Sequence, residues 1–248
     1  MFHRDYPFAV TSSPKAIKAL DYGYRNAIHY LIPAGKFGLP NLCPDKTDAC
    51  AFLCLGTESG QASMRKGNRR NSTINSRIAK TRRFMKDRQA YLADMVAQIE
   101  RQKRLAARDG MKLCVRLNGC SDIAWEGIHA AATEGKTMFD YFPDVAFVDY
   151  TKSIRRFNRT LPANYHLTLS RSDLNETECL EALARGINVA VCFAGDEPAI
   201  WRGRLAATRS ARRAGRCDRP VAKGFQGEAR YERLRSPLNI PANCEGPR

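Results

Sequence analysis

The run MKLCVRL at residues 111–117, followed by NGCSDIAWEGIHAAATEG at 118–135, decides the fold class of this chain. The run is apolar and rich in residues that favour strands, and it ends in polar and turn-forming residues. Three more runs of this kind follow, at 145–151, 165–170 and 187–193. Strands separated by helices predict a parallel sheet, either a barrel or a doubly wound layer. We therefore expect an α/β fold.

Helical patterns surround these runs. Residues 175–186 predict a short helix, with Asn175 as its N-cap and Gly186 as its C-terminal stop. Residues 73–108 carry apolar side chains at helical spacing without an interrupting Gly or Pro, and they predict one long amphipathic helix. The segment AIHYLIP at 27–33 predicts the first strand of the sheet.

Three cysteines, Cys43, Cys50 and Cys54, lie in the loop NLCPDKTDACAFLCLG at 41–56. The N-terminus lacks the apolar segment of a secretory signal, so we expect a cytoplasmic protein whose thiols stay reduced and bind a metal. The spacing Cys-x6-Cys-x3-Cys leaves a fourth position open on an iron–sulfur cluster or on zinc. Cys120, which follows a predicted strand, is a candidate fourth ligand. The alternatives are a structural zinc closed by a ligand from elsewhere, and three unconnected thiols.

The formal net charge of +16 is concentrated in two segments. Residues 201–248 carry twelve Lys or Arg against four acidic residues, and residues 65–88 carry ten against one, so the remainder is almost neutral. The second segment leads into the long predicted helix, where Arg77, Arg82 and Arg83 are candidates for binding nucleic acid phosphates. A solvated helix face is the alternative. No apolar run is long enough to span a membrane, so we expect no membrane partner.

Polar residues gather where the predicted strands end. The carboxyl ends of parallel strands are where active sites of α/β folds form. The candidate catalytic residues at these ends are Arg116, Asn118, Asp122, Asp149 and Lys152. The candidate cofactor-binding residues are Ser121, Tyr150, Thr151 and Ser170. Taken singly, such residues also serve as turn or cap residues. The two aspartates at 122 and 149 and the lysine at 152 suit acid–base chemistry and anion binding equally.

Six blocks of the sequence, in this order, resemble the phage family named after gene product 88. They are NLCPDKTDACAFLCLGTESG (41–60), RIAKTRRFMKDR (77–88), VRLNGCSDIAWE (115–126), FPDVAFVDYTK (142–152), NYHLTLSRSDLN (164–175) and GINVAVCF (186–193). The resemblance implies a phage or prophage origin, with Cys43, Cys50 and Cys54 as metal ligands. It also adds Trp125 to the pocket candidates, and His166, Ser170 and Asn175 more weakly. The apolar neighbours Tyr165 and Leu167 favour a hydrogen-bonded core histidine at 166.

The same resemblance implies a complete or partial (βα) barrel similar to that of radical S-adenosylmethionine enzymes. It thereby implies a 4Fe-4S cluster, with S-adenosylmethionine as a further cofactor. Those enzymes usually carry the spacing CxxxCxxC, which differs from the spacing in the loop at 41–56.

The C-terminal segment differs from the rest of the chain. We expect a single α/β domain at 1–198 and a basic, poorly structured tail at 199–248. Eleven of the twelve basic residues at 201–248 are Arg, which is typical of a high-GC gene read out of frame. We therefore hypothesise a frameshift near 195–210.

Three classes of function follow from these features. The first is an enzyme with an iron–sulfur cluster, whose reaction and substrate the sequence does not specify. The second is a nucleic-acid-binding phage protein with a structural zinc site. The third is a structural zinc module without catalysis.

Overall fold

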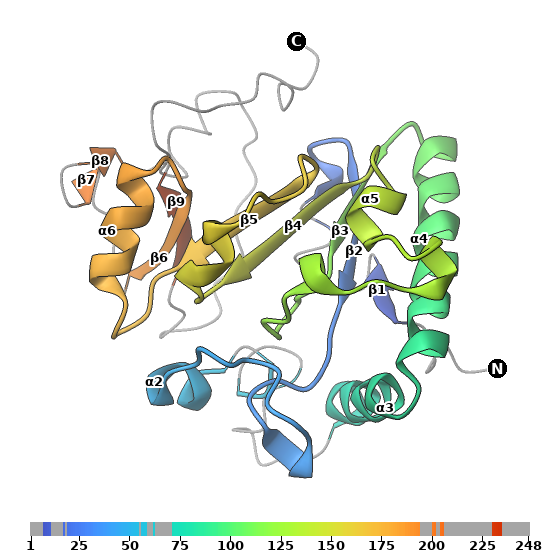
Figure 1. Ribbon diagram of the computed structural model, residues 1–248, viewed down its shortest axis with the longest axis horizontal. Coiled ribbons are helices and arrows are strands. Elements are labelled where there is room, and N and C mark those ends of the chain that lie inside the picture. Colours follow the sequence, from blue (N-terminus) through green and yellow to red (C-terminus); the bar gives the residue numbers. More distant parts are fainter. Residues whose placement is uncertain are drawn as a thin grey trace. The chain divides into compact units, whose positions relative to one another are not determined.

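The computed structural model in Figure 1 describes residues 7–10, 17, 19–54, 56–58, 62, 71–193, 200–201, 204–205 and 230–234. The chain divides into two units, and each is described by itself. The first unit holds residues 1–150, 155–167 and 246–248, and the second holds 151–154 and 168–245. All three cysteines of the predicted metal site belong to the first unit.

A mostly parallel sheet forms the centre of the first unit. Its strands follow the order β1 (Phe8–Val10), β2 (Tyr24–His29), β3 (Lys112–Arg116) and β4 (Ala146–Thr151), and it includes the first three residues of β5 (Tyr165–Ser170). The last residue of β4 and the last three of β5 belong to the second unit. Strand β1 pairs with β2 in the antiparallel sense, whereas β2 with β3 and β3 with β4 are parallel pairs. The predicted α/β fold with a parallel sheet is therefore confirmed.

The register of the parallel strands brings their carboxyl ends to one edge. Ile28 in β2 is paired with Arg116 in β3, and Val115 in β3 is paired with Phe147 in β4. The strand predicted at 27–33 corresponds to β2, which begins three residues earlier than predicted and ends at His29. The next residues leave the sheet, and the backbone amide of Ile32 donates instead to Oγ1 of Thr81 over 2.8 Å. The loop that follows β2 therefore starts at the same edge as the loop that follows β3.

Two helices, not one, occupy the segment 73–108, so the prediction of a single long helix is wrong. Helix α3 (Ser72–Lys86) and helix α4 (Arg88–Arg108) meet at Asp87, and Figure 1 shows them running in different directions. The backbone of Asp87 leaves the helical region, with φ −142° and ψ 83°. Its side chain accepts a 3.0 Å hydrogen bond from the amide of Ala90, which makes it the N-cap of α4.

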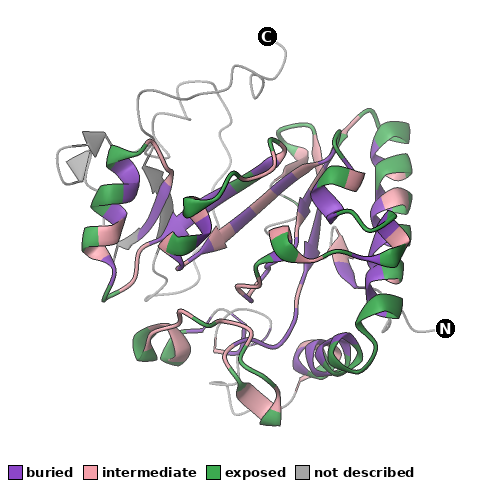
Figure 2. Ribbon diagram, in the orientation of Figure 1, coloured by how far each residue is buried: buried purple, intermediate pink, exposed green. Residues whose placement is uncertain are grey.

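Helix α4 packs against β2 and β3, and its buried residues face the sheet, as Figure 2 shows. At the end of β2, the fully buried His29 joins sheet and helix, because Tyr91 lies 2.8 Å from its Nε2 and the carbonyl of Leu117 lies 2.9 Å from its Nδ1. Burial lowers the pKa of His29 to about 3, so the imidazole is neutral near neutral pH. A neutral ring that donates to the Leu117 carbonyl and accepts from the Tyr91 hydroxyl satisfies both nitrogens.

The connection between β3 and β4 contains no long helix. It passes through the 3-10 turns η3 (Trp125–Gly127) and η4 (Ala131–Thr133) and the four-residue helix α5 (Met138–Tyr141). The connection between β4 and β5 contains the 3-10 turn η5 (Ile154–Asn158). The sequence predicted helices between the strands, and these two crossovers use short turns instead.

The second unit has its own strand order, from β5 to β6 (Val189–Phe193) and then β9 (Arg230–Leu234). Strand β6 is parallel to β5 and antiparallel to β9. The connecting helix α6 (Glu176–Ala184) begins after Asn175, and Gly186 at φ +79° lies just beyond its end, as the sequence predicted. The Asn175 side chain makes no capping hydrogen bond, however, and instead accepts from the amide of Ser172. Strands β7 (Ile200–Trp201) and β8 (Arg204–Leu205) form a separate antiparallel pair.

The sheet is open over the residues described, because β1 and β9 each have a neighbour on one side alone. A closed (βα) barrel is therefore not confirmed. Of the predicted tail at 199–248, the structure describes β7, β8 and β9, and the remaining residues lie outside the described part of the chain. The frameshift hypothesis stays a prediction.

Candidate metal centre and polar network

The cysteine loop folds around a short helix. Helix α2 (Asp48–Phe52) carries Cys50, and the hydroxyl of the N-cap residue Thr47 accepts a 3.1 Å hydrogen bond from the Cys50 amide. Cys54 follows the helix and is buried, and its sulfur accepts from the amide of Gly56 over 3.3 Å. The x3 spacing between the second and third cysteines therefore corresponds to one helical turn that ends at a buried thiol.

A fourth thiol lies beside this loop. The sulfur of Cys120 donates to the carbonyl of Leu31 over 3.0 Å, and the sulfur of Cys43 donates to the carbonyl of Cys120 over 3.6 Å. Burial raises the pKa of Cys43 to about 12, and the nearby thiols of Cys120 and Cys54 contribute to this increase. The structure thus places Cys120 next to two of the three predicted ligands.

The described residues contain no group of three or more His, Cys, Asp and Glu side chains arranged to hold a metal ion. The chemistry of the donors nevertheless suits a soft metal, because thiolates select iron–sulfur clusters, zinc and Cu(I). The metal site remains a proposal that rests on these donors and on their surroundings.

Two basic side chains of α3 face this group of thiols. Arg77 and Lys80 lie one turn apart, and each is 8% exposed. Burial raises the pKa of the Cys120 thiol, whereas the positive charges of Arg77 and Lys80 act in the opposite direction. Burial also lowers the pKa of Lys80 to about 8, and the charge of Arg77 adds to that effect. A thiolate or another anion beside these cations would be stabilised.

Two glycines allow the loops after β2 and β3 to approach each other closely. A Cβ on Gly119 would lie 2.5 Å from the carbonyl oxygen of His29 and 2.6 Å from the Tyr30 ring. A Cβ on Gly56 would lie 2.6 Å from the Pro33 ring and 3.1 Å from the Cβ of Cys120. Contacts this short exclude a larger side chain unless the loops move apart.

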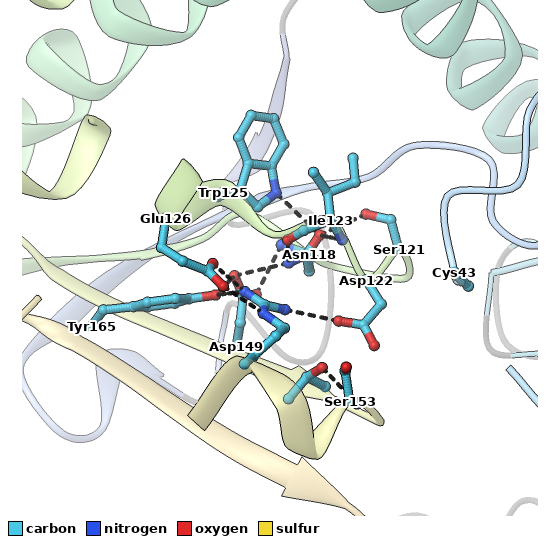
Figure 3. A network of polar contacts seen from close by, with 12 residues as sticks. Cys43, Asn118, Ser121, Asp122, Ile123, Trp125, Glu126, Asp149, Ser153 and Tyr165 are labelled. Atoms are coloured by element: carbon cyan, nitrogen blue, oxygen red, sulfur yellow. Dashed lines mark hydrogen bonds and ion pairs between the residues drawn. The ribbon is translucent and has the colours of Figure 1, made fainter. Parts of the chain in front are cut away.

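Asn118 organises the loop that follows β3, as Figure 3 shows. Its side-chain oxygen accepts three hydrogen bonds, from Ser121, Ile123 and Trp125, over 2.9 to 3.1 Å. Its amide nitrogen Nδ2 donates to the carbonyl of Ile123 over 2.9 Å. Two sequence candidates, Asn118 and Ser121, therefore contact each other and shape this loop.

Asp149 is the buried acid at the centre of the polar network in Figure 3. Its carboxylate accepts from the backbone amide of Asn118 over 2.8 Å and from the hydroxyl of Tyr165 over 3.2 Å, and Nε of Arg116 lies 3.8 Å away. Burial raises the pKa of Asp149 to about 7, although Arg116 and the hydrogen bond from Asn118 oppose this increase. The side chain is therefore able to exchange a proton near neutral pH.

Arg156 connects the other acidic groups of the network. Its guanidinium binds Glu126 through contacts of 2.9 and 2.6 Å, Asp122 over 2.8 Å and the hydroxyl of Tyr165 over 2.9 Å. The sequence prediction missed this residue because it lies in η5, outside the strand ends. The run SIRRFNR (153–159) does not distinguish Arg156 from the other basic residues beside it, which are exposed in the structure.

The remaining strand-end candidates are divided between the units. In the first unit, the guanidinium carbon of Arg116 lies 4.8 Å from the centre of the Tyr150 ring. In the second unit, Nζ of Lys152 lies 3.3 Å from Oγ of Ser170, and Oγ1 of Thr151 accepts from the amide of Ser153. The candidate His166 is exposed and lines a depression at the amino ends of the strands, together with Lys112.

The three arginines predicted to bind nucleic acid do not share an exposed face. Arg77 is buried, its Nη1 donates to the carbonyl of Gly56, and its guanidinium carbon lies 4.6 Å from the centre of the Tyr30 ring. Arg83 forms an ion pair with Asp94 on α4. Arg82 alone of the three is exposed without such a contact among the residues described.

Comparison with known proteins gave one match. The family model described as gene product 88 matches residues 8–236, so the match includes the cysteine loop, the strand-end network and part of the segment after 198. Neither the curated proteins nor the solved structures gave a match. Within the described residues, none of the helices has the length and apolar character needed to cross a membrane.

Proposed function

The chain belongs to the gene product 88 family, and on this premise we propose that it is a phage or prophage protein that binds an iron–sulfur cluster through Cys43, Cys50 and Cys54. The observation that carries the proposal is the approach of Cys120 to the cysteine loop, where the Cys43 sulfur lies 3.6 Å from the Cys120 carbonyl and Gly56 contacts both Cys54 and Cys120. Soft thiolate donors next to positive charge favour a centre with net negative charge.

The protein's own residues define the surroundings of this centre. The 3.0 Å bond from Cys120 to the carbonyl of Leu31 and the packing at Gly56 hold the loops after β2 and β3 together. Burial of Cys54 and partial burial of Cys120 limit access of water to the thiols. A bound cluster of this kind supplies one-electron chemistry.

The enzymatic form of the proposal places S-adenosylmethionine at an iron position that the three cysteines leave open. This form of the proposal requires a partial barrel rather than a closed one, because the sheet is open over the described residues. Asp149 is the group of the network able to hold or release a proton near neutral pH, because its pKa lies at about 7. Arg116 and Asn118 position that carboxylate.

The test is the metal content of protein purified without oxygen. We expect about four iron atoms per chain and a brown protein. The Cys50→Ser variant should lose its iron, and Cys43→Ser and Cys54→Ser should behave in the same way. Cys114→Ser is the matched control, because Cys114 lies within β3 rather than in the loop, and it should retain iron. Iron that survived Cys50→Ser would refute the cluster assignment.

Zinc is the alternative metal, and the proximity of Cys120 favours it as a specific second candidate. Four thiolates, including Cys120, would close a tetrahedral zinc site. Elemental analysis that finds about one zinc and no iron per chain supports this alternative. Loss of zinc in Cys120→Ser would then identify the fourth ligand.

A further inference from the structure

Arg77 and Lys80 form a buried cationic pair on the inner face of α3. We propose that this pair binds the carboxylate or phosphate group of a small anionic ligand next to the thiols. The inference rests on the proposed function for the identity of the neighbouring centre, and it names a second ligand of the same site. The pair itself is defined by the burial of both residues and by the hydrogen bond from Arg77 to Gly56.

The charges of this pair lack carboxylate partners among the residues described. Neither residue forms an ion pair there, although eleven other ion pairs are present in the described part of the chain. Burial lowers the pKa of Lys80, and the repulsive charge of Arg77 lowers it further. Buried charges are normally paired, because their removal from water is costly. Two adjacent, largely buried cations without a carboxylate partner among the described residues are therefore suited to binding an anion.

The geometry of Arg77 favours an oxyanion. Its Nη1 donates to the carbonyl of Gly56, and its guanidinium lies over the Tyr30 ring, which together fix the planar group. Its Nε is buried and has no hydrogen-bond partner. A guanidinium presents its donors as a fork that matches a carboxylate or phosphate group. The buried, unpartnered Nε on a fixed guanidinium is therefore a donor suited to such a group.

Helix α3 is held rigidly where the pair lies. The hydroxyl of Thr81 accepts from the amide of Ile32 over 2.8 Å and donates to the carbonyl of Arg77 over 2.8 Å. On the same face of the helix, Ile74 and Ile78 pack with Ile32 in a small apolar cluster. The pair is thus positioned before a ligand arrives, which reduces the entropy lost on binding.

The proposed cluster does not by itself neutralise both cations. In its oxidised 2+ state, a 4Fe-4S core held by three thiolates would carry a net formal charge of about −1. Against the two positive charges of Arg77 and Lys80, this leaves one positive charge uncompensated. A single carboxylate or phosphate group supplies the missing charge, and this argument selects an anionic ligand over a neutral one.

The test is thermal unfolding of the full-length protein, with iron content measured on the same samples. Inorganic phosphate and acetate are the probes, each titrated against chloride at constant ionic strength. We expect the wild-type Tm to rise and then saturate with at least one probe, and the probe that acts distinguishes phosphate from carboxylate. The Lys80→Met variant should lose this rise.

The Tm of Lys80→Met also distinguishes a ligand-binding lysine from one with a purely structural role. Because the variant removes an unpaired buried charge, its Tm without phosphate or acetate should equal or exceed that of the wild type. Arg77→Lys keeps the charge but loses the fork, and its affinity for the active probe should fall by about tenfold. Arg82→Met, an exposed change on the same helix, should keep the full rise.

Two results would overturn the inference. One is a wild-type Tm that responds to neither probe in iron-loaded protein, which would leave the cluster proposal intact. The other is loss of iron in Lys80→Met to the same extent as in Cys50→Ser, because the cation would then serve the cluster itself. A Tm rise in protein that contains no iron supports the anion site and refutes the cluster.

Discussion

The backbone amide of Asn118 donates a 2.8 Å hydrogen bond to Oδ1 of Asp149, and this bond joins the loop after β3 to a buried acid within β4. The side chain of Asn118 then fixes Ser121, Ile123 and Trp125. The shape of the loop that carries Cys120 therefore depends on one carboxylate in the neighbouring strand.

The ionisation of Asp149 should appear in the pH dependence of stability. The free carboxyl ionises near pH 3.8, and the folded one near pH 7. Between these values the folded state keeps a proton that the unfolded state releases, so the free energy of unfolding falls as the pH rises from about 4 to about 7. The Asp149→Asn variant lacks this decrease. Relative to that variant, the wild type should lose up to about 4 kcal/mol across the interval.

Urea unfolding of both proteins between about pH 4 and pH 8 measures this difference. Titration of His29 affects both proteins and cancels in the comparison. Asp144→Asn, a change of an exposed acid, should show the wild-type dependence. A difference between wild type and Asp149→Asn that is constant with pH would contradict the raised pKa.

Arg156 should be the most sensitive residue of the network. Arg156→Met leaves Asp122 and Glu126 without their cation, and Glu126 is 3% exposed at its side chain. Breaking a buried ion pair on one side costs about 3–5 kcal/mol. Arg155→Met removes an ion pair with Asp45 whose arginine side chain is 75% exposed, and it should cost less than about 1 kcal/mol.

Equilibrium urea unfolding at neutral pH separates these two arginine variants. Adding Glu126→Gln to Arg156→Met should restore part of the lost stability, because one unpaired charge is removed. Equal, small losses in both arginine variants would mean that the network is not tightly coupled.

Gly119→Ala should destabilise the junction of the two loops. The added Cβ would meet the His29 carbonyl and the Tyr30 ring at less than 3 Å, and relief of such overpacking costs about 1–3 kcal/mol. Gly127→Ala is the matched control, because nothing lies within 4 Å of its added Cβ. Thermal unfolding measures both, and a larger loss at Gly127 would contradict the packing described.

Asp87→Ala should weaken the start of α4. The variant loses the side-chain cap on the Ala90 amide, and N-cap removal costs about 1 kcal/mol. Arg104→Ala, an exposed change within α4, should have little effect. Circular dichroism during urea unfolding provides the comparison. An unchanged midpoint in Asp87→Ala would show that packing alone separates α3 from α4.

The sequence predicted the strands well where an apolar run ends in a polar residue. Strands β3, β4, β5 and β6 all lie within their predicted ranges. The sequence placed strand β2 too late, because AIHYLIP (27–33) stays apolar after the chain has left the sheet to pack on α3. It missed the helix break because an aspartate is compatible with both a helix interior and an N-cap.

The site was predicted in part. The prediction that successive strands belong to one parallel sheet was enough to bring Asn118 and Asp149 together, because β3 and β4 are neighbouring strands. The position of Arg77 was not predicted, because helical spacing alone does not say which basic residues of α3 face the thiols. Arg156 was missed because its partners, Asp122 and Glu126, are about thirty residues away in sequence.

The close approach of Gly56 to Pro33 and Cys120 also sets an order of assembly. Cys43 and Cys120 are separated by 77 positions in the chain, so they meet only after residue 120 has been synthesised. During synthesis, the surroundings of the thiols are therefore incomplete until the ribosome has passed residue 120. Metal delivered earlier would meet a flexible loop with three thiols, whereas metal delivered later would meet a finished site.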